Sequence, residues 1–566
     1  MSLQEQIYSD SYANLLVRSY VIQSENYLRM LSPDSSILKI DSQYSILFLK
    51  KDTLPENLLR DVPYSTVPKL FSPLSTLSLE VSGIIQTQNL PGSGLTGKNV
   101  IIGFVDTGID YTHPAFLDAS GKTRILRIWD QTIQSGHPPA LFPYGSEYTK
   151  EQINEALEND EPYTIVPQKD RNGHGTFVAG VAAGSPNPAN DFLGAAPDAD
   201  LVVVKLKEAK QYLRDFYLVS PEATVYQEDD IMTALRYLTH VAETEKKPLV
   251  ICLTLGSNQG SHSGSLPLDI MLSHLGETQG IIPVCATGNE GGMAHHYFGS
   301  GYENLTPVNV EIRVPDGSSG FYMELWGQAP QLFSVGFRSP VGESIPRIPV
   351  SLNQEQRISF VLEQTVIYVN YDVVQTSTGS QLIVMRLKDP TPGIWNLQVY
   401  NSISSYLDFH IWLPLTGIAK PDITFLEPNP YTTLTSPSTS IPILSPSTYQ
   451  ASNNSIYLHS GRGFTRLGNK KPDFAAPGVA VTGPGPSGSY ISRTGSSASA
   501  AITAGAAALL LQWGMQRTPV HYFTSQELKI YLVRGAVRSP DLNYPNREWG
   551  YGKLNLYHTF EALMTT

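Results

Sequence analysis

The chain of 566 residues has little cysteine and no excess of basic residues. Its two cysteines, Cys252 and Cys285, lie inside apolar runs, which favours buried thiols over a disulfide. There are 39 lysines and arginines against 51 aspartates and glutamates, so the net charge is −12. Because nothing here would neutralise phosphates, we expect no nucleic-acid partner.

Long apolar runs and targeting signals are also missing. No run of about 18 apolar residues occurs, and the N-terminal stretch MSLQEQIYSD has neither the basic nor the apolar region of a signal peptide. We therefore expect no membrane partner, no ordinary secretion and a cytoplasmic or other internal location.

The sequence offers no clear metal site. It has no contiguous loop with the ligand spacing of a calcium site. The pair His295-His296 could suggest a metal, but adjacent side chains point apart on most backbones. We expect no metal at the histidine pair and no other cofactor, and dependence on calcium stays open.

Short apolar runs alternate with helical patterns through much of the chain. Such runs are typical of parallel strands buried on both faces, and strand–helix–strand order with short turns predicts βαβ units, hence an α/β fold. The predicted strands are Val100–Val105, Leu201–Val204, Leu249–Leu253 and Ile281–Cys285, and the predicted helices are Ile231–Ala242, about Leu266–Leu275 and Ala500–Trp513.

Two other regions do not follow this alternation of apolar runs and helical patterns. Residues 1 to about 80 read as a small α+β unit, with a possible helix at Tyr12–Leu31 and strands within Ile37–Leu49. Residues 295–425 contain short alternating segments between turn residues, which predicts an inserted antiparallel β-sandwich, plausibly a jelly roll. These segments are Val308–Val314, Phe321–Trp326, Arg357–Leu362, Val366–Val374, Leu382–Leu387, Ile394–Val399 and Leu407–Leu413.

Polar residues with catalytic chemistry follow the predicted strands or open helices. Asp106 ends the first strand, His174 lies between two glycines before a small-residue helix, and Ser497 opens another such helix. A nucleophilic serine needs a base, and the base needs a partner that fixes its tautomer. Asn289, after the strand Ile281–Cys285, could join the Ser497 N–H in stabilising an oxyanion.

Each motif alone has a plainer interpretation. Asp106-Thr107-Gly108 also occurs in aspartic proteases, but those need two carboxylates sharing a proton, and no second copy exists in this chain. A histidine between glycines can be a core residue, and a serine at a helix start is usually a cap. Their joint occurrence at strand ends and helix starts favours catalysis.

The order Asp, His, Ser resembles that of the subtilisin-like serine proteases. The similarity lies in Val105–Gly108, Asn172–Thr176, Thr254–Gly256, Thr287–Gly291, Ala476–Gly478 and Gly495–Ala498, and covers roughly residues 85–292 and 430–566. It implies that Asp106, His174 and Ser497 form the triad and that Asn289 helps to bind the oxyanion. The family's usual Gly-Thr-Ser-Met-Ala is replaced by Gly-Ser-Ser-Ala-Ser, in which Ser497 aligns best.

The resemblance also implies substrate-binding walls and a division of the chain. The walls would be formed by Thr254, Leu255, Gly256, Ala286, Thr287 and Gly288. The division is a prodomain acting as folding chaperone at 1–80, a catalytic domain at 81–294 and 426–566, and the insertion at 295–425. Thr432–Tyr449, a linker by composition, should contain a catalytic-domain strand near Ile441–Leu444.

The insertion, the N-terminal unit and the ending Glu548–Asn555 resemble the Csp-type germination proteases of clostridial spores. That likeness implies a location in the spore interior or cortex region. It also implies a jelly roll that rigidifies the enzyme, and the zymogen of a spore cortex-lytic hydrolase as the protein substrate. The cleaved prodomain would stay bound, after a cut between about Pro73 and Glu80. Two alternatives stay open: a general intracellular degradative protease, and a regulator or germinant sensor with an idle triad.

Overall fold

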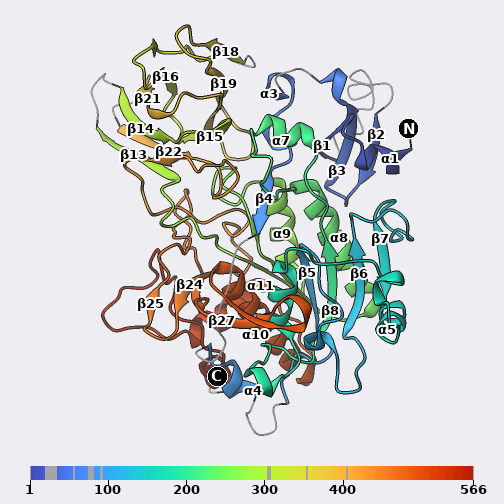
Figure 1. Cartoon of the computed structure of the whole chain (residues 1–566). Coiled ribbons are helices and arrows are strands. Elements are labelled where there is room, and N and C mark those ends of the chain that lie inside the picture. Colours follow the sequence, from blue (N-terminus) through green and yellow to red (C-terminus); the bar gives the residue numbers. More distant parts are fainter. Residues whose placement is uncertain are drawn as a thin grey trace.

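The computed structural model describes residues 2–19, 35–54, 58–73, 82–88, 94–302, 307–351, 355–402 and 406–564. Figure 1 shows an N-terminal unit (dark blue) and a β-sandwich side by side above an α/β unit. The α/β unit contains both the green middle part of the chain and its red C-terminal part, so the sandwich is inserted between them.

A six-stranded sheet forms the centre of the α/β unit. Its order is β12-β10-β5-β8-β6-β7, with all neighbouring pairs parallel except β6 and β7. The strands are β5 (Ile101–Asp106), β6 (Ile125–Asp130), β7 (Ser146–Thr149), β8 (Asp200–Lys205), β10 (Leu249–Leu253) and β12 (Ile281–Cys285). The predicted α/β class is confirmed, and β10 and β12 have their predicted bounds.

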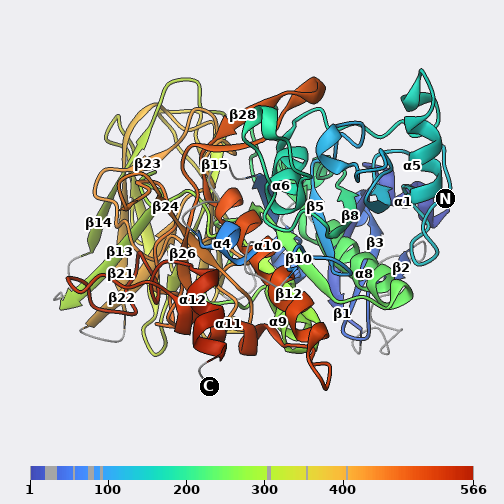
Figure 2. The ribbon, with the colours of Figure 1, turned by 90° about the horizontal axis from the view of Figure 1, so that it is seen from below.

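Helices cover both faces of this sheet because its strands are apolar on both faces. Alternate residues of β5 divide between two cores: Ile102 and Phe104 pack with helices α6 and α10, and Ile101 and Val105 with α8 and α9. Figure 2 shows the sheet between α6 and α8. These helices are α6 (His174–Ala183), α8 (Glu228–Glu245), α9 (Pro267–Glu277) and α10 (Ser496–Gln516).

Helix α10 owes its place to its small side chains. Alanines and Gly505 let it approach its neighbours closely, and a Cβ at Gly505 would lie 2.2 Å from the Ala195 Cβ. By length and composition α10 could also cross a membrane, and it is the one such helix among the described residues. Since 89% of that stretch is buried inside the protein, it is a core helix here.

The remaining elements of the α/β unit lie around this centre. The strand expected near Ile441–Leu444 is β24, which begins two residues after Leu444, and Leu444 itself makes an isolated parallel bridge to Val284. Ile441 lies outside the strand and is 53% exposed. The elements are α4 (Ile84–Gln88), α5 (Lys150–Leu157), α7 (Gln211–Phe216), β24 (Pro446–Gln450), β25 (Ser455–Ile456), β26 (Phe474–Pro477), β27 (Val481–Pro484), β28 (Tyr490–Arg493), α11 (Ser525–Gly535) and α12 (Leu556–Met564).

The N-terminal unit is a three-stranded antiparallel sheet of order β1-β3-β2. It corrects the helix predicted at Tyr12–Leu31, because Tyr12–Arg18 is strand β1; residues 20–31 lie outside the described part. Pairing of all seven β1 residues with β3 and burial of six of them outweigh local helix propensity. The elements are α1 (Leu3–Tyr8), β1 (Tyr12–Arg18), β2 (Ser36–Lys39), β3 (Tyr44–Lys50) and α3 (Leu58–Asp61).

Residues 296–425 form two antiparallel sheets around a core of their own. The sheet orders are β13-β22-β15-β20-β19-β18 and β17-β16-β21-β14-β23. Strands at each predicted segment are present, whereas β13, β16, β17 and β23 were not predicted. The bounds are β13 (His296–Tyr302), β14 (Val308–Val314), β15 (Gly320–Gly327), β16 (Phe333–Arg338), β17 (Ser344–Ile345), β18 (Gln356–Ser359), β19 (Val366–Asp372), β20 (Gln381–Lys388), β21 (Gly393–Asn401), β22 (Tyr406–Trp412) and β23 (Thr424–Phe425).

The sandwich packs against both other parts of the chain. The His262 ring, from the α/β unit, stacks on Trp412 of β22 with ring centres 4.0 Å apart. Tyr64, from the N-terminal segment, donates a 2.6 Å hydrogen bond to the buried Glu324 carboxylate of β15. These contacts fix how the parts are placed, although the predicted domain boundaries themselves stay a prediction.

Candidate active site

Three side chains from distant parts of the chain meet at the carboxyl edge of the central sheet. Asp106 is the last residue of β5, His174 the first of α6, and Ser497 lies in the first turn of α10. Gly173, before α6, has a φ of 76°, which favours glycine. Gly175 must also lack a side chain, since a Cβ there would lie 2.2 Å from the Gly108 carbonyl oxygen.

The three side chains form a continuous hydrogen-bonded chain. His174 Nδ1 lies 2.7 Å from Asp106 Oδ1, and His174 Nε2 lies 3.1 Å from Ser497 Oγ. All three residues are buried. An ionised Asp106 keeps the proton on Nδ1, which leaves Nε2 to accept the serine proton. The geometry is that of a nucleophile, a base and an orienting acid.

The surroundings of Asp106 keep it ionised. Burial would raise the pKa of this carboxyl, but the charge of a protonated His174 and hydrogen bonds outweigh it, so its pKa lies below the ordinary value. Apart from His174, the donors are the Thr107 N–H, 2.7 Å from Oδ1, and the Thr254 hydroxyl, 2.7 Å from Oδ2. Thr254, predicted to wall the substrate site, therefore also contacts the triad aspartate.

Asn289 lies beside the serine. It follows β12, and its Oδ1 accepts a 3.0 Å hydrogen bond from the Ser496 N–H. Because this bond uses the amide oxygen, the Nδ2 hydrogens are left as donors. The pairing of Asn289 with the Ser497 N–H at an oxyanion stays a prediction.

The other predicted substrate-binding residues lie on both sides of this point. Leu255 and Gly256 form β11, which pairs antiparallel with another segment of the chain. Ala286 is buried and donates its N–H to the Leu253 carbonyl at 3.1 Å. Thr287 and Gly288 hydrogen-bond through main-chain atoms to Thr435 and Gly461 respectively. Thr287 and Gly288 are thus held by the C-terminal part of the chain, and the role of these residues as substrate-binding walls stays a prediction.

One functional residue escaped the sequence reasoning. Asp170 accepts hydrogen bonds at one oxygen from the Thr107 hydroxyl and the Gly173 N–H, both at 2.8 Å. Its other oxygen accepts from the Thr176 N–H at 2.9 Å and hydroxyl at 2.7 Å. It therefore ties the loop after Asp106 to the start of α6. Its place four residues before His174 is the sequence signal that could have revealed it.

The paired histidines make separate contacts. His295 Nδ1 lies 2.6 Å from the Glu290 carboxylate, whereas His296 Nε2 lies 2.9 Å from His410 Nδ1. Among the described residues, no group of three histidine, cysteine, aspartate or glutamate side chains could hold a metal ion.

Comparison with known proteins identifies the family of this fold and site. The sequence model of the subtilase family matches residues 97–552. The chain belongs to the subtilase family. A solved structure of the same family, the CspB protease of Clostridium perfringens, is 31% identical and superposes with a TM-score of 0.76, covering 86% of this chain and 98% of that one. The predicted relationship to subtilisin-like and Csp-type proteases is confirmed.

Curated subtilases match over shorter stretches. The subtilisin of Bacillus sp. strain TA39 is 27% identical over 210 residues, which are 37% of each chain. Serine protease AprX of Bacillus subtilis is 31% identical over 198 residues, 31% of this chain and 36% of AprX. The subtilisin-like protease SBT2.1 of Arabidopsis thaliana is 29% identical over 182 residues, 29% of this chain and 20% of that protein. The matched stretches thus span well under half the length of these three relatives.

Replacing Asn289 by alanine should slow turnover without preventing folding. The change removes the predicted oxyanion donor, and losing such a donor costs roughly 10²–10³ in kcat, or about 2.7–4 kcal/mol of transition-state stabilisation. The measurement is steady-state cleavage of a peptide with the sequence of residues 66–80, together with thermal melting. A fall of less than tenfold in a folded variant would mean that the oxyanion is held elsewhere.

Proposed function

We propose that this subtilase is an active serine endopeptidase in which Ser497 is the nucleophile. The observation that carries the proposal is the unbroken hydrogen-bonded chain Asp106–His174–Ser497, with donor-to-acceptor distances of 2.7 and 3.1 Å. An idle triad would need no such alignment, so the active enzyme is favoured over the regulator or sensor.

The reaction follows from the geometry. As Ser497 Oγ attacks a peptide carbonyl, His174 Nε2 takes its proton, and Asp106 stabilises the imidazolium that forms. The developing oxyanion accepts hydrogen bonds from the Ser497 N–H and from Asn289 Nδ2. His174 then gives the proton to the leaving amine, the acyl-enzyme remains on Ser497, and water releases it by the same steps in reverse.

The first substrate would be the chain itself. Strand β4 (Leu70–Pro73), drawn at the centre of Figure 1 in blue, is the middle strand of a small sheet of order β11-β4-β9, where β9 is Tyr226–Gln227. Ser72 and Pro73 pair antiparallel with Gly256 and Leu255, so the end of β4 lies next to Thr254. Extended substrates bind proteases in this manner, by main-chain pairing.

This pairing supports self-cleavage just beyond β4, because proximity makes that bond the first to be cut. The predicted cut, between about Pro73 and Glu80, falls in residues 74–80, outside the described part. On this proposal residues 1 to about 80 are a prodomain that assists folding and then stays bound. Its interface includes a 2.6 Å hydrogen bond from Asn14 to Asp229, and Lys210 donates to the carbonyls of Gln6 and Tyr12.

Intact mass spectrometry tests the self-cleavage. The parent protein should give two fragments that co-purify, with the cut between about Pro73 and Glu80, whereas Ser497→Ala should give one full-length chain. A single full-length chain from both proteins would remove the self-cleavage proposal and favour the idle-triad alternative. Two fragments from both would point to another protease.

The further substrate is proposed from the resemblance to Csp-type proteases, which the similarity to the CspB protease supports. It is the zymogen of a spore cortex-lytic hydrolase, activated by limited cleavage during germination in the spore interior or cortex region. The sandwich would be a jelly roll that rigidifies the enzyme. No nucleic acid, membrane or cofactor takes part.

An assay with two protein substrates tests the choice of substrate. We expect the enzyme to cleave such a zymogen at one bond and to leave casein intact. Broad degradation of casein would favour the general degradative protease.

A further inference from the structure

A buried carboxylate lies directly after the proposed oxyanion residue. Glu290 is only 3% exposed. Its Oε2 accepts hydrogen bonds from His295 Nδ1 at 2.6 Å and Asn258 Nδ2 at 3.2 Å, and its Oε1 accepts from the Thr416 hydroxyl at 2.8 Å and N–H at 3.3 Å. Burial would raise the pKa of this carboxyl, but His295 and these hydrogen bonds outweigh it and hold the pKa below its usual value.

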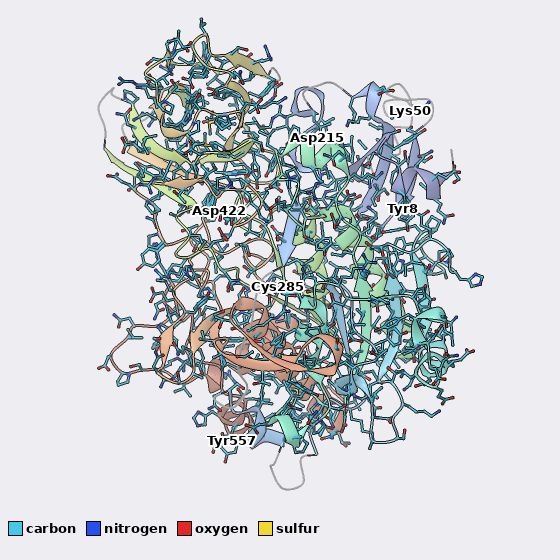
Figure 3. The ribbon with its side chains drawn as sticks, in the orientation of Figure 1. Tyr8, Lys50, Asp215, Cys285, Asp422 and Tyr557 are labelled. Atoms are coloured by element: carbon cyan, nitrogen blue, oxygen red, sulfur yellow. The ribbon has the colours of Figure 1, made fainter. Side chains whose placement is uncertain are left out.

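Two of the three residues that donate to Glu290 lie at the start of the sandwich or within it. His295 immediately precedes β13, and Thr416 follows β22. Asn258 comes from the loop after β11. Figure 3 labels Cys285, the last residue of β12, in the interior, and Asp422 where the sandwich meets the α/β unit. Glu290 therefore joins the start of the sandwich and the segment between β22 and β23 to the loop that follows β12.

Only one residue, Asn289, separates Glu290 from the reaction centre along this chain of contacts. Asn289 hydrogen-bonds Ser496, the neighbour of Ser497. The loop around it is held on both sides, since the Gly461 N–H donates to the Gly288 carbonyl at 2.9 Å and the Gly291 N–H donates to the His459 carbonyl at 3.1 Å. Because Glu290 and Asn289 are consecutive residues of this loop, we expect a displacement of Glu290 to shift Asn289 as well.

We propose that Glu290 is a positioning residue through which the inserted sandwich holds Asn289 in place for the oxyanion. The inference rests on the proposed serine-protease function. It gives the sandwich a second role, because the insertion then sets the turnover rate as well as contributing stability. On this proposal, a contact between the sandwich and the α/β unit affects the turnover rate only if it is made to Glu290.

Two matched variants separate this role from general loosening of the interface. Thr416→Ala removes a charge-assisted hydrogen bond from the sandwich to Glu290. Ser380→Ala removes another charge-assisted bond across the same interface, which the Ser380 Oγ accepts from Arg466 Nη2 at 2.8 Å and which does not end on Glu290. Since a small misplacement of a catalytic group can cost up to about 10²-fold, Thr416→Ala should lower kcat about tenfold with KM within about twofold. Ser380→Ala should leave kcat unchanged.

A double-mutant cycle with Asn289→Ala identifies the route. Because Thr416 acts through Asn289, the loss from Thr416→Ala should disappear when Asn289 is already alanine. The inference would be overturned if Thr416→Ala lowered kcat equally in the parent and in the Asn289→Ala background. It would also be overturned if Thr416→Ala and Ser380→Ala lowered kcat equally. Glu290→Gln, which keeps the shape of the side chain, should lower kcat further than Thr416→Ala; an unchanged kcat in this variant would also overturn it.

The concentration of active sites is titrated in every variant with a fluorophosphonate, and kcat is expressed per labelled site with the peptide of residues 66–80 as substrate. A parent protein that does not react with the probe would contradict the proposed function itself. If the parent reacts with the probe but kcat is unchanged in Thr416→Ala and Glu290→Gln, only the positioning role is contradicted.

Discussion

Replacing Ser497 by alanine should lower kcat for peptide cleavage by about 10⁶-fold, the scale of loss when the nucleophile of a serine protease is removed. Ser497 Oγ is the hydroxyl that lies 3.1 Å from His174 Nε2. The measurement is cleavage of the peptide of residues 66–80, with thermal melting to show that the variant folds.

The neighbouring serines provide matched controls. The Ser499 hydroxyl donates to Thr448 and to the carbonyls of Ala476 and Pro477, so it holds α10 against the segment before it. The Ser496 hydroxyl is buried without a hydrogen-bond partner in the described structure. Ser496→Ala should therefore retain cleavage. Activity that survives Ser497→Ala but is lost in Ser496→Ala or Ser499→Ala would move the nucleophile.

Asp106→Asn should lower kcat by about 10⁴-fold while leaving the fold intact. An amide in this position can present N–H groups to His174 and so favour the tautomer with the proton on Nε2, which cannot accept the serine proton. The loss of negative charge also removes the stabilisation of the imidazolium. The expected result is a large fall in kcat with little change in KM for the same peptide.

Asp110→Asn is the control for Asp106→Asn. Asp110 lies near the same loop, but its carboxylate accepts from the N–H and hydroxyl of Thr112. The Asp110→Asn variant should keep nearly full activity. Similar losses from the two substitutions would show that loop distortion, rather than the triad, explains the effect.

Much of this site could be predicted from the sequence because its chemistry follows local patterns. Apolar runs identified β5, β8, β10 and β12 of the central sheet but not β6 or β7, and polar residues at the ends of these runs pointed to Asp106 and Asn289. Parallel strands bring such ends to one edge of a sheet, so local patterns predicted that Asp106 and Asn289 lie near each other. The choice of Ser497 among the serines that open α10 came from the resemblance to the subtilisin-like motif, because a serine at a helix start is usually a cap.

Other features depend on contacts between distant residues, which no local pattern contains. Strand β1 forms because β3 pairs with it, and β4 became recognisable only when it lay between β9 and β11. The role of Glu290 depends on Thr416, 126 positions away in the sequence. Asp170 was within reach of the sequence, but its four hydrogen bonds appear only when the loops fold together.

The most direct test of the central claim is to find the residue that a fluorophosphonate modifies. The probe reacts with an activated serine, and a long incubation allows for the proposed binding of β4 in the substrate site. Tandem mass spectrometry of the peptide Thr494–Arg517, which contains Ser496, Ser497 and Ser499, then locates the adduct. The account predicts modification of Ser497 in the parent and none in Ser497→Ala or His174→Ala. An adduct on Ser496 or Ser499, equal labelling of His174→Ala, or no adduct on the folded parent would contradict it.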